Sequence, residues 1–254
     1  IDDGYLLDYI PNGYLLYKRQ HIEKGNEYES LWTYDIQKGK RSKLYTSKDK
    51  IDLALFSPDG KHISLIEVDE GQADLYIISK SDKMAYKITP VNHLQPRLIK
   101  WKNDNILYFV NINNGRSTLL SYNIDKNESK IEFSLDKIIE DFDTFNDKFL
   151  FIGSDENSLN KSIYITEKGS NLKKINTGFK AKFFDDNHII YLKNMEKEDK
   201  NILHIHNLEN RDEQKNLDHN IANHFKLNEE DIVLVEKNTC NNNYTLIKYN
   251  VLEN

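Results

Sequence analysis

The feature that most constrains the fold is an internal repeat of about 40 to 45 residues. One series of short apolar segments recurs at intervals of 40 to 48 residues; its first residues are Leu15, Ile63, Ile106, Phe149, Ile189 and Ile232. A second series recurs at intervals of 40 to 44 residues and begins at Leu31, Leu75, Leu119, Ile163, Leu203 and Leu246. Such self-similarity indicates a fold built from repeated supersecondary units.

Each repeated segment has the character of a β-strand. The segments are short, β-branched or aromatic, and bounded by Gly, Asn, Asp or Lys. A further strand precedes each member of the first series and ends in turn residues, as in Phe56-Ser57-Pro58-Asp59-Gly60. Four strands per unit, repeated six times without helices, predict an all-β fold, a six-bladed β-propeller of four-stranded antiparallel blades. A β-sandwich is the alternative, but it would not predict this even spacing.

The repeat spans the chain as one predicted domain, 1–254, with blades at about 5–47, 51–90, 94–134, 138–177, 179–219 and 221–254. A third series follows the second by 12 to 14 residues and has no sixth member; it is centred on Leu44, Ile88, Ile131, Ile175 and Leu217. We therefore expect the last blade to be incomplete, or to be closed by the N-terminal residues around Ile1 to Gly4 or by sequence upstream. An unpaired outer edge would invite association with another chain.

One unit carries a family motif. The stretch from Leu53 to Thr89 contains a Phe-Ser-Pro-Asp-Gly-Lys turn, a following strand, an Asp-Leu-Tyr strand and a closing Thr. It resembles the TolB-type repeat, also called PD40 or WD40-like. That resemblance implies a propeller of the kind found in periplasmic binding proteins or as the gating domain of prolyl-oligopeptidase-like peptidases. The chain has no Gly-x-Ser-x-Gly elbow, so a fused peptidase is not expected within it.

Composition limits the classes of partner that the chain is expected to bind. The net charge is -6, from 35 Lys plus Arg against 41 Asp plus Glu, so nucleic acid is not an expected partner. Cys240 is the only cysteine, which excludes a disulfide framework, and we interpret it as an incidental loop residue. No apolar run is long enough to span a membrane, and an anchor upstream of Ile1 stays an open alternative.

Clustered histidines and carboxylates raise the question of metal binding or catalysis. His204 and His206 alternate along one strand, with His219 and His224 following, and we interpret the first two as polar positions of a solvated outer strand. Most of three carboxylate pairs are interpreted as turn residues; the pairs are Asp141 and Asp143, Asp185 and Asp186, and Glu229 and Glu230. We therefore expect no catalytic residues, no metal site and no cofactor.

Aromatic residues before the turns are expected to fill the core between blades. These are Phe56, Trp101, Phe184 and Phe225.

The expected partner-binding surface lies on the loops that join second to third strands and blade to blade, because these emerge on one side of a propeller. Six such loops are predicted to be long, at 19–30, 67–73, 111–117, 153–161, 194–201 and 237–243. Three of only five arginines lie in or beside them, and guanidinium groups bind carboxylates with fixed geometry. The candidate residues for a carboxylate-bearing peptide or small anion are Arg19, His93, Arg97 and Arg116. Chance placement of surface charges is the alternative.

Three functions remain. The favoured one is a non-enzymatic binding or scaffolding propeller outside the cytoplasm that engages a protein or peptide through its long-loop face. The second is a propeller-type enzyme, a lyase, lactonase or glycosidase, with a site around the central channel. The third is the sensor ectodomain of a membrane-anchored chain.

Overall fold

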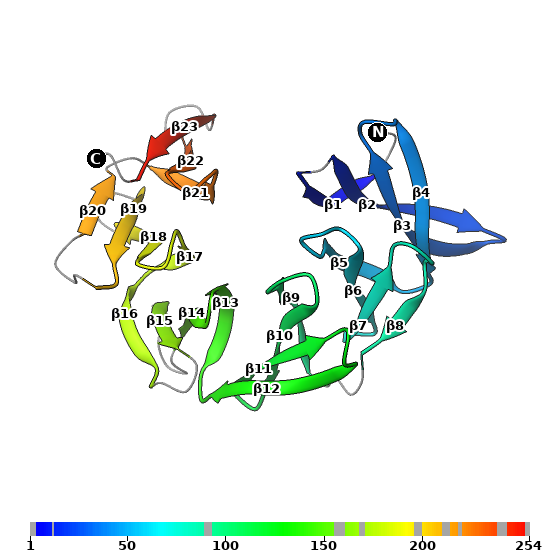
Figure 1. The fold of residues 1–254 in the computed structure, drawn as a ribbon, viewed down its shortest axis with the longest axis horizontal. Coiled ribbons are helices and arrows are strands. Elements are labelled where there is room, and N and C mark those ends of the chain that lie inside the picture. The colour runs from blue at the N-terminus through cyan, green and yellow to red at the C-terminus, as the bar shows by residue number, and fades with distance from the viewer. Residues whose placement is uncertain are drawn as a thin grey trace. The chain divides into compact units, whose positions relative to one another are not determined.

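The computed structural model describes residues 4–11, 13–88, 93–154, 161–167, 171–195, 200–209, 214–217, 220–237 and 243–251. Within these ranges every regular element is a β-strand, and the strands form six antiparallel sheets (Figure 1). The prediction of an all-β fold is therefore confirmed. No helix in the described ranges has the length and apolar character that a membrane crossing needs.

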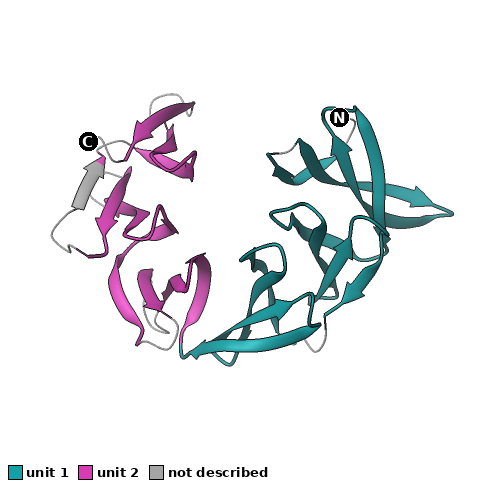
Figure 2. Ribbon diagram, viewed as in Figure 1, with its two compact units in different colours: residues 1–136 teal, residues 137–254 magenta. Residues whose placement is uncertain are grey.

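The chain divides into two compact units, residues 1–136 and 137–254 (Figure 2). The first unit holds three four-stranded meanders, whose strands pair in chain order. Their strands are β1 (Tyr5–Ile10), β2 (Tyr14–Glu23), β3 (Asn26–Asp35), β4 (Lys40–Ser47), β5 (Lys50–Phe56), β6 (His62–Asp69), β7 (Gln72–Ser79), β8 (Ala85–Lys87), β9 (Leu94–Trp101), β10 (Ile106–Asn113), β11 (Arg116–Asn123) and β12 (Glu128–Leu135).

The second unit holds two four-stranded sheets and, in its described residues, one sheet of three strands. Its strands are β13 (Ile138–Phe145), β14 (Lys148–Ser154), β15 (Ser162–Glu167), β16 (Lys173–Thr177), β17 (Phe179–Phe183), β18 (His188–Met195), β19 (Lys200–Asn207), β20 (Gln214–Leu217), β21 (Ile221–Lys226), β22 (Asp231–Lys237) and β23 (Tyr244–Asn250). In the described residues the last sheet lacks a fourth strand, as the missing third-series segment predicted. Of the N-terminal residues 1–4 that were expected as one source of that strand, 1–3 lie outside the described residues.

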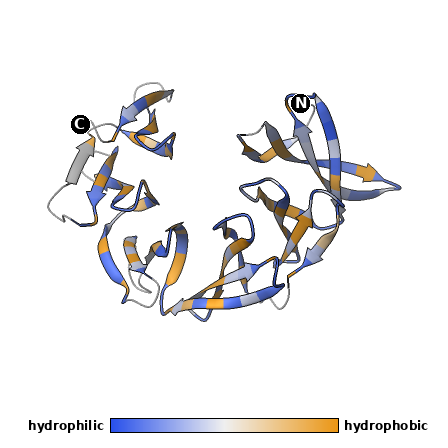
Figure 3. Cartoon of the chain, viewed as in Figure 1, coloured by the Kyte–Doolittle hydropathy of each residue, from blue (hydrophilic) through white to orange (hydrophobic). Residues whose placement is uncertain are grey.

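Apolar side chains pack between neighbouring sheets within each unit. Leu31 of the first sheet packs with Ile51 and Ala54 of the second, and Leu203 of the fifth packs with Ile221 and Ile232 of the sixth. Figure 3 shows the apolar residues gathered on the strands and the polar residues on the connections. Each second-series segment lies on the third strand of its sheet, as predicted.

Three of the predicted long loops are strand hairpins. Residues 19–30, 67–73 and 111–117 continue β2–β3, β6–β7 and β10–β11 to two-residue turns. Both central residues of each turn have positive φ, as in a type I′ turn; the pairs are Lys24-Gly25, Glu70-Gly71 and Asn114-Gly115. The prediction of long loops there was wrong because this turn chemistry allows the strands to pair to their ends. The other three loops lie partly outside the described residues.

The aromatic residues before the turns are only partly core residues. Phe56 and Phe184 are buried, as predicted, and Trp101 is half-buried against the cluster between the second and third sheets. Phe225 is 54% exposed, so its predicted place in the core was wrong. His224 takes the buried position on β21, and strand alternation turns the next side chain to the opposite face.

Candidate functional site

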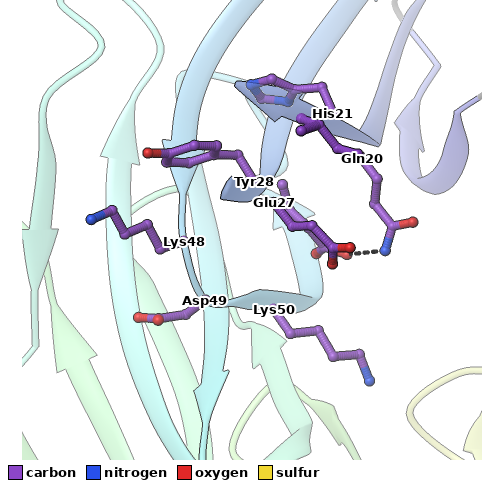
Figure 4. Close-up of a pocket in the computed structure, with 9 residues that line it drawn as sticks. Gln20, His21, Glu27, Tyr28, Lys48, Asp49 and Lys50 are labelled. Carbon is purple, nitrogen blue, oxygen red and sulfur yellow. Dashed lines mark hydrogen bonds between the residues drawn. The ribbon is translucent and has the colours of Figure 1, made fainter. Parts of the chain in front are cut away.

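The first unit has a surface depression of about 540 Å³ between the far half of the β2–β3 hairpin and the connection from β4 to β5 (Figure 4). This volume falls in the range of ligand pockets. It lies where a hairpin between second and third strands meets a connection between sheets. Its lining residues are Gln20, His21, Ile22, Glu27, Tyr28, Glu29, Lys48, Asp49 and Lys50.

The floor of the depression is held by a buried ion pair of the β2–β3 hairpin, which also hydrogen-bonds to the next sheet. Glu29 Oε2 lies 3.0 Å from Lys18 Nζ and accepts a 2.6 Å hydrogen bond from the backbone N–H of Ile51. Lys18 also donates to the carbonyl oxygen of Ile51 at 2.6 Å, and Gln20 Nε2 donates to Glu29 Oε1 at 2.9 Å. The Glu29 carboxylate therefore ties the hairpin to β5 and is already saturated with donors.

Above the floor, an aromatic pair forms the wall. His21 and Tyr28 face each other across the hairpin, and their rings stack with centroids 5.7 Å apart and planes 24° apart. Ser30 Oγ lies 3.4 Å from His21 Nδ1 and accepts a 3.0 Å hydrogen bond from Trp32 Nε1. The stacking and the Ser30 contact orient the His21 ring towards Tyr28, so the two rings together form a platform.

The rim is charged and partly apolar. Lys48, Lys50 and Glu27 are exposed, and Ile22 is 72% exposed. Lys50 lies 3.5 Å from a carboxylate oxygen of Asp52, a surface pair of little energetic weight. Lys48 forms no ion pair with any residue in the described ranges. The depression can thus offer cations, an aromatic face and an apolar contact to one ligand.

Arg19 lies beside this depression without lining it. It sits on β2, half-buried, with its guanidinium carbon 5.9 Å from the centroid of the Trp32 ring. Lys43 Nζ lies 5.6 Å from the same centroid. The guanidinium expected to meet a partner in a loop therefore contacts an aromatic ring of its own sheet.

The other three candidate residues belong to the third sheet. His93 precedes β9 with a φ of 58°, and its carbonyl oxygen accepts a 3.0 Å hydrogen bond from Ile112. Arg97 is exposed on β9, and Arg116 begins β11, 3.3 Å from a carboxylate oxygen of Asp136. Across the described parts of the chain, no hydrogen bond or ion pair joins these three residues to Arg19. Their role in binding stays a prediction.

His204, His206 and His224 of the second unit are buried, so the prediction of a solvated strand was wrong for His204 and His206. Both lie on β19, the third strand of its sheet, where the neighbouring strands and sheet exclude water. His204 stacks on Tyr191 at 5.2 Å, and burial lowers the pKa of the His204 imidazole. His224 Nε2 donates a 2.7 Å hydrogen bond to the carbonyl oxygen of Lys180, and burial lowers the pKa of His224 to about 4.

The described ranges contain no group of three or more His, Cys, Asp or Glu that could hold a metal ion. His219 and Cys240 lie outside those ranges.

The carboxylate pairs divide between turns and strands. Asp185 is a turn residue, as predicted, because its Oδ1 accepts hydrogen bonds from the backbone of Asn187 and His188 at 2.7 Å. Asp141 and Asp143 lie on β13, so this pair is not among those in turns.

Sequence reasoning did not find the Tyr28 platform. Its signal was the Lys24-Gly25 turn, which places Tyr28 opposite His21 once the strands are extended to it.

No protein-family model and no curated protein matches the chain. Among solved structures, the β-propeller domain of the Trilobed protease from Pyrococcus furiosus superposes with a TM-score of 0.72 and 16% identity, over 98% of this chain and 83% of that one. An oligogalacturonate lyase in complex with manganese gives a TM-score of 0.69 and 12% identity, over 94% of this chain and 71% of that one. TolB from Acinetobacter baumannii gives 0.53 and 16%, over 97% of this chain and 60% of that one.

These likenesses establish the β-propeller fold that the repeat predicted. The chain spans 60% of the length of the TolB structure. The propeller domain of a protease, an oligogalacturonate lyase and TolB share the fold, so the fold alone does not determine the function.

Proposed function

We propose that this chain is a non-enzymatic binding or scaffolding propeller that engages a protein or peptide partner through the depression of its first unit. The observation that carries the proposal is the combination in one pocket-sized hollow of a stacked aromatic pair, His21 and Tyr28, with Lys48, which forms no ion pair with a residue that the structure describes. Aromatic anchors with a charged rim are typical of binding hot spots.

The chemistry of the rim favours a peptide over a simple anion. Lys48 and Lys50 suit a carboxylate, whereas Glu27 would repel a small anion that filled the whole hollow. Ile22 and the Tyr28 ring suit an apolar or aromatic side chain. The proposed ligand is therefore an extended segment with a carboxylate next to an apolar residue.

We propose in addition that the repeat is of the TolB type and that the chain works outside the cytoplasm. The Ser57-Pro58-Asp59-Gly60 turn and the likeness to TolB support a TolB-type, PD40 or WD40-like repeat, working outside the cytoplasm.

The likeness to oligogalacturonate lyase favours one alternative, an enzyme acting on an acidic polysaccharide. Incubating the full chain with polygalacturonate and manganese tests it. Our proposal predicts no unsaturated product above the background of a chain-free control, and sustained product formation would favour the lyase.

The binding proposal is tested by selecting displayed random peptides on the full chain and titrating the consensus peptide by calorimetry. We expect Tyr28→Ala and Lys48→Ala each to weaken binding about tenfold or more, a loss of about 1.4 kcal/mol or more. The matched controls are Tyr86→Ala and Lys126→Ala, which change exposed residues of the same unit. Arg19→Ala, Arg97→Ala and Arg116→Ala test the earlier candidates in the same titration. The proposal would be contradicted if Tyr28→Ala and Lys48→Ala both bound the peptide as tightly as the wild type.

A further inference from the structure

A further pocket, of about 270 Å³, lies in the second unit between the fourth and fifth sheets. We call it the second-unit pocket. It is bounded by the start of β14, the end of β15 and the start of β16 in the fourth sheet, and by residues that follow β17 and β19 in the fifth. Its volume lies just below the range of about 300 to 1,000 Å³ that is usual for drug-sized ligands, so it suits a ligand with a single small ring.

The floor of the second-unit pocket is aliphatic. Ile165 of β15 and Leu208, which follows β19, are half-buried, and both pack on the apolar cluster between the fourth and fifth sheets. The backbone N–H of Leu208 donates a 2.7 Å hydrogen bond to the carbonyl oxygen of Asn187, which fixes the backbone of that leucine. A ligand that fills this pocket therefore needs one apolar face.

The repeat shows why the space between these two sheets is open. Lys148 is the first residue of the second strand of its sheet, as Tyr14 is in the first sheet. Leu208 follows the third strand of the next sheet, as Lys80 does in the second sheet. Between the first two sheets, Lys80 Nζ lies 3.3 Å from the centroid of the Tyr14 ring, so a ring and a long side chain close the equivalent space. In the second unit, Lys148 Nζ instead donates to Asp186, to its carbonyl oxygen at 2.7 Å and its carboxylate at 2.9 Å, and the pocket stays open.

The charges at the rim of the second-unit pocket balance. Two lysines and two glutamates line it: Lys148, Lys173, Glu167 and Glu209. Lys148 lies opposite Glu167 in the β14–β15 ladder and bonds to the Asp186 carboxylate, so its ammonium group is already close to negative charge. A ligand of either sign would meet a like charge at this rim, and like charges in contact are unfavourable. The rim therefore favours a neutral ligand.

The rim also offers both hydrogen-bond donors and acceptors. The side chains of Asn171 and Lys173 form no hydrogen bond or ion pair with a residue that the structure describes. With its amide nitrogen turned towards Glu209, Asn187 donates to Glu209 Oε1 at 3.3 Å. A carboxylate can accept several hydrogen bonds, so Glu209 keeps capacity for a ligand. An amide, an ammonium group and a carboxylate thus surround an aliphatic floor.

We propose that the second-unit pocket binds a neutral saccharide unit. A pyranose ring has a face of C–H groups, which matches the floor of Ile165 and Leu208. Its hydroxyl groups both donate and accept, which matches the carboxylate of Glu209 and the donors of Asn171 and Lys173. Ligand pockets commonly combine an apolar lining with a few polar groups in this way. The site lies in the second unit and does not depend on the depression of the first.

The probes are the methyl glycosides of glucose, galactose, mannose and N-acetylglucosamine, each added to the full chain and observed by saturation-transfer NMR. We expect at least one of them to bind and its titration to saturate. Glu209→Ala and Asn171→Ala should each weaken that binding about fivefold or more, because each removes a hydrogen-bonding partner of the hydroxyl groups. Both residues are exposed, so neither change should disturb the fold. The control Glu230→Ala changes an exposed glutamate of the same unit outside the pocket and should leave the affinity unchanged.

The charge of the ligand provides the second test. The methyl glycoside of glucuronic acid and free glycine are titrated in the same way. Tighter binding of the glucuronide than of every neutral glycoside would show that the pocket selects an anion, and tighter binding of glycine would assign it to an amino acid. Either result would overturn the proposal. Absence of saturable binding by all the neutral glycosides, or unchanged affinity in both Glu209→Ala and Asn171→Ala, would overturn it too.

Discussion

The carboxylate of Asp8 accepts a 2.8 Å hydrogen bond from the backbone N–H of Phe56, 48 residues later and on the first strand of the next sheet. Asp143 makes the same 2.8 Å contact to the N–H of Phe183 in the second unit. In both cases the aspartate lies two residues before the end of a first strand, and the acceptor meets the last residue of the following first strand. These carboxylates couple neighbouring sheets where no backbone ladder joins them.

Removal of this contact should lower stability by an amount set by the unpaired N–H group. We expect Asp8→Ala to reduce the free energy of unfolding by about 1 to 3 kcal/mol. Asp8→Asn should lose less, because burial raises the pKa of Asp8 and the amide keeps an acceptor without a charge to desolvate. Urea titration measures both, and Asp69→Ala, at an exposed carboxylate, is the control. Equal losses in Asp8→Ala and Asp69→Ala would contradict this account.

The stability lost when an aromatic residue before a turn is replaced by alanine should depend on its burial rather than on its position in the repeat. Phe56→Ala and Phe184→Ala should each cost about 3 to 5 kcal/mol, because each leaves a cavity in the core. Phe225→Ala should cost less than about 1 kcal/mol, since that ring is mostly exposed. Chemical denaturation of the three variants checks the order. A loss at Phe225 as large as that at Phe56 would show that its ring is buried in solution.

Acid should destabilise the second unit through His224. Burial holds the pKa of His224 at about 4 in the folded chain, against about 6.5 when unfolded, with the cations of Lys180 and Lys182 lowering it further and Asp143 opposing them. Between these values the unfolded chain binds the proton and the folded chain does not. Stability is therefore lost as the pH falls from about 6.5 towards 4, by about 3 kcal/mol from this group.

The variant His224→Gln isolates that contribution, because glutamine can still donate towards the Lys180 carbonyl but does not titrate. Unfolding titrations of wild type and variant from pH 7 to pH 4 should converge as the pH falls. Parallel curves would show that His224 does not carry the pH dependence.

The floor of the depression should respond strongly to loss of one charge. Glu29→Ala leaves the Lys18 ammonium group, which is largely buried, and the N–H of Ile51 without their shared acceptor. We expect a loss of about 3 to 5 kcal/mol. Asp136→Ala removes the exposed partner of Arg116 and should change stability by less than about 0.5 kcal/mol. Thermal unfolding of both variants tests the contrast, and similar melting temperatures would argue against a structural role for the buried pair.

The repeat predicted the fold because burial within each sheet follows local alternation. Leu31 and Leu75 occupy equivalent positions and are fully buried, as the periodicity predicts. Phe225 shows the limit of that reasoning, since its exposure depends on His224 having taken the buried face of β21. Which of two adjacent bulky residues faces the core is decided by packing against another sheet, which the local pattern does not contain.

The candidate site was predicted less well than the fold. The connections between second and third strands indicated where the binding surface would lie. The arginine criterion, however, selected Arg19 and missed Tyr28. Tyr28 lies opposite His21 only because β2 and β3 pair as far as their turn. Lys18 and Glu29 also hydrogen-bond to the backbone of Ile51 on β5, in the next sheet. The pairing of β2 with β3 does not reveal this contact. Contacts between sheets therefore shape the hollow.

The central claim is that a peptide binds in the depression lined by Tyr28 and Lys48, and a hydrogen-exchange footprint tests it most directly. The consensus peptide from the library is added in saturating amount to the full chain, and exchange is compared with and without it. The account predicts slowed exchange in residues 20–29 and 48–50, and no such change in the Tyr28→Ala variant at the same peptide concentration. Protection confined to other parts of the chain, with residues 20–29 and 48–50 unchanged, would contradict it.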